Sequence, residues 1–98
     1  MVQVVDINVD RTELILTVDN GKRVTSQTVA FDKVQTIRMS KETVKKWFSS
    51  KEVRRIELFV KDKEEPYTIG SDKVKSFDAI EEVIRQLAVK HQIPVEQN

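Results

Sequence analysis

The sequence contains no cysteine, a single histidine, and only two glycines and two prolines among its 98 residues. Without cysteine the chain can form neither a disulfide nor a thiolate metal site. One histidine leaves too few ligands for a transition-metal site, and two glycines cannot build a glycine-rich phosphate-binding loop. We therefore expect no metal and no cofactor.

Long hydrophobic runs are missing as well. The longest apolar runs are a few residues long, whereas a membrane-spanning helix needs about 20. The first residues have neither a basic start nor a sustained apolar segment, so we expect no signal peptide. Charged residues make up 34% of the chain and the formal net charge is +1. This composition predicts a single soluble domain, residues 1–98, in the cytoplasm.

The clearest periodic pattern lies near the C-terminal end. Large apolar residues recur there at spacings of three and four, which places them on one face of a helix. They are Phe77, Ile80, Val83, Ile84 and Leu87. Pro94 disfavours helical geometry in the residue before it. The pattern predicts an amphipathic helix over about residues 76–92, followed by a tail at 93–98.

The stretch before this helix has the alternation of a strand. Ile56, Leu58 and Val60 share one face and polar residues separate them. A charged loop at 62–65 and a short apolar run at 67–70 complete a hairpin pattern. We expect the helix to pack on the face formed by the three apolar residues.

Four further strand-sized runs precede residue 40. Each is rich in β-branched or alternating apolar residues and ends at a polar turn. They cover residues 2–9, 12–18, 23–31 and 34–39. In the first run the alternation changes phase between Val4 and Val5. Either both faces of this strand are partly buried, or a bulge resets the phase.

Asn20-Gly21 is the strongest turn signal in the chain. Both residues tolerate a positive φ, which a type I′ hairpin turn requires. The strand that follows, from Arg23 to Ala30, is unusually polar. That polarity predicts a strand at or near an edge of the sheet.

Residues 40–50 fit two structures. They can form a short helix capped by Ser40, or a strand over residues 43–48 that turns into the next strand. Valine, threonine and aromatic residues in this stretch favour the strand. The whole chain then gives about six to seven short strands within 2–39 and 53–70, followed by one helix. This order predicts an α+β fold with an antiparallel sheet or barrel.

Strands followed by one amphipathic helix resemble a small bacterial pleckstrin-homology-like domain. The residues that carry this resemblance are Arg55–Asp62, Tyr67–Gly70 and Phe77–Leu87. It implies a bent antiparallel barrel with the helix at one open end, and a role in binding phosphoinositides or proteins. Lipid-binding members cluster basic residues around the first hairpin, where this chain has only Arg11 beside Asp10. The resemblance therefore favours a protein partner.

Residues 41–55 carry six basic residues and two acidic ones around Trp47 and Phe48. Such a stretch could bind phosphates and stack on bases, or lie on an anionic membrane. Alternatively, the two aromatic residues belong to the core and the lysines are ordinary surface. The candidate partner-binding residues are Lys45, Lys46, Trp47, Lys51, Arg54 and Arg55.

No group of residues indicates catalysis. Serines and threonines are plentiful, but none lies in a recognisable frame for a nucleophile and its base. We therefore expect no enzyme, no catalytic residue and no small-molecule substrate. The sequence predicts a non-catalytic interaction module that binds a protein or itself. The alternative is binding of nucleic acid or an anionic membrane through residues 41–55.

Overall fold

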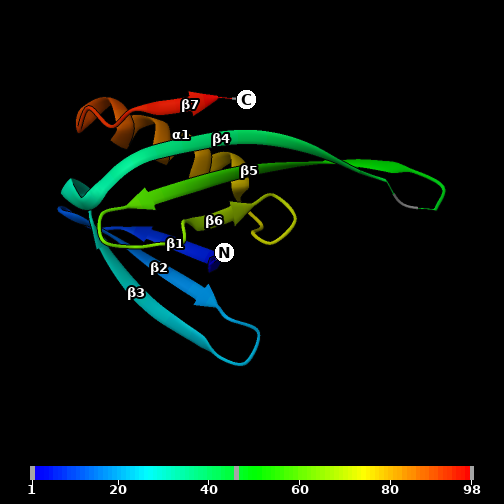
Figure 1. The fold of residues 1–98 in the computed structure, drawn as a ribbon, viewed down its shortest axis with the longest axis horizontal. Helices are drawn as coiled ribbons and strands as arrows, with labels where there is room; N and C mark the ends of the chain where they lie inside the picture. The colour runs from blue at the N-terminus through cyan, green and yellow to red at the C-terminus, as the bar shows by residue number, and fades with distance from the viewer. Residues whose placement is uncertain (1, 46, 98) are drawn as a thin grey trace.

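The computed structural model describes residues 2–45 and 47–97, which form a seven-stranded sheet and one α-helix (Figure 1). The predicted α+β class is confirmed. The elements are β1 (Val2–Val9), β2 (Glu13–Asp19), β3 (Val24–Ala30), a 3₁₀ turn (Phe31–Lys33), β4 (Val34–Lys45), β5 (Ser50–Val60), β6 (Tyr67–Gly70), α1 (Phe77–Lys90) and β7 (Val95–Gln97).

The sheet is mixed, so the prediction of a purely antiparallel sheet is wrong. Its strand order is β3-β2-β1-β6-β5-β4-β7. β1 runs parallel to β6, and β4 runs parallel to β7. Parallel partners must come from distant parts of the chain, and hairpin signals between neighbouring runs cannot reveal them. β3 lies at one edge of the sheet, as its polarity predicts.

α1 packs on the predicted face of β5. Ile56 and Leu58 are fully buried, and Ile84 of α1 lies with them in one hydrophobic core. Leu58, Ile84 and Leu87 line the same apolar space between the sheet and the helix. The alternation along β5 therefore identified its buried face correctly.

The sheet is curled rather than flat. Tyr67 of β6 donates a hydrogen bond of 2.6 Å to the side-chain oxygen of Gln27, although β1 and β2 lie between their strands. β1 contributes to the curvature through a bulge, because its register to β2 shifts between Val4 and Asp6. The bulge lets Val4 and Ile7 both face the core, as one of the two sequence interpretations predicts.

The turn between β2 and β3 is not the predicted type I′ turn. Asp19 pairs with Val24, so four residues form the connection. Gly21 has a φ of +90°, but Asn20 is not in the left-handed region. Instead, the Asn20 side-chain oxygen accepts hydrogen bonds from the backbone N–H groups of Lys22 and Arg23, at 3.0 and 2.9 Å. An asparagine can thus form a turn in two ways: by adopting a positive φ, or, as here, by accepting backbone hydrogen bonds with its side chain.

The expected tail at 93–98 contains β7. The backbone N–H of Ile37 donates a hydrogen bond of 2.9 Å to the carbonyl of Pro94, and Val95–Gln97 continue beside β4. Arg38 and Glu96 form an ion pair of 3.3 Å across the two strands. The three residues of β7 are exposed, so this segment lacks the alternation of apolar residues that would have predicted a strand.

Residues 41–45 continue β4, which confirms the strand interpretation for that part of 40–50. The predicted strand at 43–48 is nevertheless too long, because β4 ends at Lys45 and Trp47 and Phe48 lie in a bend. β4 and β5 together form a hairpin that extends far beyond the rest of the molecule (Figure 1).

Candidate functional site

The outer part of the β4–β5 hairpin forms an arm, defined here as residues 41–55. Its stem is the paired part nearest the sheet, residues 41–42 and 52–55. β4 and β5 pair continuously out to Lys45 and Ser50. β6 pairs with β5 only at residues 55–58, and β7 pairs with β4 only at residues 37–39. The arm is therefore a two-stranded ribbon that leaves the sheet, and Figure 1 shows it projecting away from the body.

Trp47 and Phe48 lie at the end of the arm with almost their whole surface in solvent. They are 96% and 97% exposed, and their ring centroids are 6.5 Å apart. The interpretation of these two residues as core is wrong, because the arm carries them beyond the reach of the sheet and the helix. Singly scattered apolar residues are normal on a surface, but two adjacent exposed aromatic rings form an apolar patch.

The charges along the stem of the arm are balanced by neighbours. Lys41 lies 3.9 Å from the carboxylate of Glu52, on one side of the ribbon. Arg55 pairs with Glu42 on the other side. These exposed pairs contribute little to stability, but they neutralise the stem.

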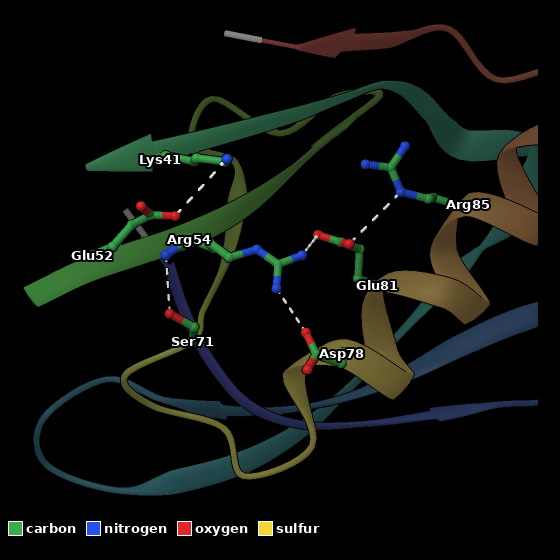
Figure 2. Close-up of polar contacts among 7 residues, drawn as sticks. All are labelled: Lys41, Glu52, Arg54, Ser71, Asp78, Glu81 and Arg85. Carbon is green, nitrogen blue, oxygen red and sulfur yellow. Dashed lines mark hydrogen bonds and ion pairs between the residues drawn. The ribbon is translucent and has the colours of Figure 1, made fainter. Parts of the chain in front are cut away.

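Arg54 connects the base of the arm to α1 (Figure 2). Its guanidinium donates a hydrogen bond of 2.6 Å to Asp78 and another to Glu81. It also lies 5.0 Å from the centre of the Phe77 ring. The hydrogen bonds that Arg54 donates to Asp78 and Glu81 raise the pKa of Arg54, so the guanidinium stays charged.

The backbone of Arg54 is anchored as firmly as its side chain. Its N–H donates a hydrogen bond of 2.9 Å to the Ser71 hydroxyl, and its carbonyl accepts one of 2.9 Å from the Ser71 N–H. Arg54 thus holds the direction of the arm relative to the sheet and helix. It is a positioning residue, and its charge is already matched within the chain.

Lys45 and Lys51 remain without an ion pair among the described residues. Cα partners that face each other across an antiparallel pair carry their side chains on the same side. Lys45 therefore lies on the same side as Lys41 and Arg54, and Lys51 lies on the opposite side. The two unpaired lysines flank the aromatic pair from both sides of the ribbon.

The structure thus divides the predicted site. Lys45, Trp47 and Lys51 come together at the end of the arm, whereas Arg54 and Arg55 belong to its paired stem. Lys46 lies outside the described residues. Phe48 was missing from the predicted set, although its place beside the tryptophan in a basic stretch was the signal that could have identified it. We call Lys45, Trp47, Phe48 and Lys51 the tip.

A small hollow beside the base of the arm is lined largely by charged side chains. Its volume is about 90 Å³, its lining includes Arg54, Arg85 and Glu81, and Glu81 forms an ion pair with each of the two arginines. Among residues 2–45 and 47–97, no three His, Asp or Glu side chains gather as they would around a metal ion.

Comparisons of the chain with protein-family models, with curated proteins and with solved structures find no match. The resemblance to pleckstrin-homology-like domains therefore stays a prediction. Within the described part of the chain, no helix has the length and apolar character required to cross a lipid bilayer.

Proposed function

We propose that this protein is a non-catalytic interaction module that docks on the surface of a partner through the tip of its arm. The observation that carries the proposal is the adjacent pair Trp47 and Phe48, almost fully exposed at the end of a projecting hairpin. Large aromatic side chains supply much of the free energy in protein contacts when they are buried.

The construction of the arm suits this role. Paired strands fix the backbone on both sides of the tip, and the contacts of Arg54 with α1 and Ser71 fix the base. A contact element that is ordered before binding loses less conformational entropy when it docks. The arm therefore presents its aromatic pair at a low entropic cost.

The pleckstrin-homology-like resemblance agrees with a binding role but names a different place for it. In that family the first hairpin loop contacts lipid headgroups. Here the connection between β1 and β2 contains Asp10 and Arg11, which bring one charge of each sign. The proposed contact element is the arm, and it does not depend on the resemblance.

Self-association through β3 is a second candidate function. β3 pairs only with β2 among the described strands, so its outer backbone groups are open to another strand. Val24, at the start of β3, is 59% exposed. Sedimentation equilibrium over a range of concentrations tests this function, and a monomer at every concentration would exclude it.

The tip can be tested with its own reporter, because Trp47 is the only tryptophan in the chain. Its emission should be red-shifted and readily quenched by acrylamide in the free protein. The emission should then shift to the blue when the tip binds one of three probes, namely phospholipid vesicles, single-stranded DNA and duplex DNA. It should also shift to the blue if the protein self-associates through the tip at high concentration.

A matched pair of variants identifies the surface involved. Phe48→Ala should weaken the binding, whereas Val89→Ala, which truncates an exposed apolar residue on α1, should not. A blue-shifted, protected emission in the free protein would contradict the proposal. So would binding that Phe48→Ala and Val89→Ala leave equally strong.

A further inference from the structure

The positive charge of the arm is concentrated at its end. Residues 43–51 contain three lysines and no acidic residue. Farther down the stem, Lys41 and Arg55 are matched by Glu52 and Glu42. Lys45 and Lys51, which pair with no acid among the described residues, therefore occupy the same end of the ribbon as the exposed aromatic surface.

This distribution does not suit a partner that runs along the arm. A nucleic acid presents a regular line of phosphates, and a ribbon that follows it needs unpaired cations along one side. Here the side that carries Lys45 is neutralised at Lys41 and at Arg54. Lys51 lies on the opposite side, where it could not contact the same strand of phosphates.

The distribution does suit an extended anionic surface that the arm meets end-on. In that orientation Trp47 and Phe48 enter first, and Lys45 and Lys51 reach the surface on either side of them. An anionic lipid bilayer offers both parts of this contact. Aromatic rings are favoured at the level of the headgroups, and lysines are attracted by the negative surface potential.

We infer that the tip binds the surface of an anionic lipid bilayer, with Trp47 and Phe48 inserted among the headgroups and Lys45 and Lys51 in contact with anionic lipids. The inference rests on the proposed function, because it names the partner of the same tip. It describes binding at one leaflet, through a few side chains. Binding should therefore be reversible and sensitive to salt.

The test compares vesicles of phosphatidylcholine alone with vesicles that also contain phosphatidylglycerol. Sedimentation with the vesicles measures binding, and the emission of Trp47 reports insertion. We expect binding and a blue shift only with the anionic vesicles. Replacing one lysine near the surface should weaken binding about fivefold, so Lys45→Gln/Lys51→Gln should weaken it roughly 25-fold.

Lys33→Gln/Lys90→Gln is the matched control, since it removes the same charge from two exposed lysines far from the arm. This control should weaken binding much less than the tip variant. Phe48→Ala should weaken binding and reduce the blue shift. Equal binding by tip variant and control would overturn the inference, because net charge alone would then explain the attraction.

The failure of the lipid inference can be told apart from the failure of the proposed function. Tighter binding to single-stranded or duplex DNA than to anionic vesicles at the same salt concentration, with loss in Phe48→Ala, would overturn the lipid inference and leave the tip as the contact element. A concentration-dependent blue shift without vesicle binding would do the same in favour of self-association. A protected Trp47 in the free protein would overturn both.

Discussion

The guanidinium of Arg54 on β5 donates a hydrogen bond of 2.6 Å to the carboxylate of Asp78 in the first turn of α1. Figure 2 shows the same guanidinium reaching Glu81, one turn farther along the helix. One cation of the basic stretch, near its C-terminal end, thus serves the fold. It fixes the base of the arm and leaves partner binding to the residues at the tip.

Arg54→Ala should lower the free energy of unfolding by about 1 kcal/mol, because it removes a partly exposed ion-pair network and a cation–π contact with Phe77. Urea unfolding measures the change. Arg85→Ala removes only a loose pair with Glu81 at 3.8 Å and should cost about 0.3 kcal/mol. Equal losses in the two variants would show that the Arg54 side chain stabilises the fold no more than the loose Arg85–Glu81 pair does.

The pH dependence of this network follows from the raised pKa of Arg54. A raised pKa in the folded state gives stabilisation that is complete below the unfolded-state pKa and is lost only as the pH rises through the folded-state value. The destabilisation by Arg54→Ala should therefore stay constant from neutral pH to about pH 11. Unfolding measured across this range would contradict the assignment if the difference disappeared.

Trp47→Ala should leave the fold intact and change the free energy of unfolding by less than about 0.5 kcal/mol, because the side chain is 96% exposed. Circular dichroism and urea unfolding of the variant measure this. A loss of several kcal/mol would show that Trp47 packs against the body of the protein in solution.

Leu58→Asp should abolish the folded state. Leu58 is 1% exposed in the core beside Ile84, and a carboxylate there would be buried without a partner. Val24→Asp makes the same chemical change at a position that is 59% exposed and should remain folded. The far-ultraviolet circular dichroism of the two variants gives the comparison. A folded Leu58→Asp variant would mean that the faces of β5 are reversed.

Thr68→Val should raise the free energy of unfolding by about 1 kcal/mol. Thr68 in β6 is 2% exposed, and its hydroxyl has no hydrogen-bond partner among the described residues. Valine keeps the shape and removes the cost of a buried, unpaired polar group. Thr28→Val, on the exposed side of β3, should change stability little. Destabilisation by Thr68→Val would reveal a partner for the hydroxyl.

Local patterns predicted the parts of the fold that depend on neighbours in the chain. The alternation of Ile56, Leu58 and Val60 identified a buried face, and the spacing around Ile84 identified the helix that covers it. The break in phase after Val4 anticipated the bulge. In each case the signal is local, because the periodicity of a helix or strand places apolar side chains on one face within a few residues.

The sequence predicted which segment contains the candidate site, but it did not predict which side chains of that segment are exposed and which are paired. Composition pointed to residues 41–55, but it could not tell whether Trp47 was core or exposed. It also could not separate Arg54, which is bound by Asp78 and Glu81, from Lys45, which forms no ion pair with any described residue. That distinction depends on residues more than twenty positions away in the chain.

The sequence by itself determined an α+β chain with one amphipathic helix, several strands of defined inner face, and a basic stretch around two aromatic residues. Only the tertiary structure decided that β1 pairs with β6 and β4 with β7, and that β4 and β5 extend past the sheet as an arm. The physical reason is the range of the forces concerned. Periodicity records local burial, whereas strand partners and exposure depend on which distant segments the folded chain brings together.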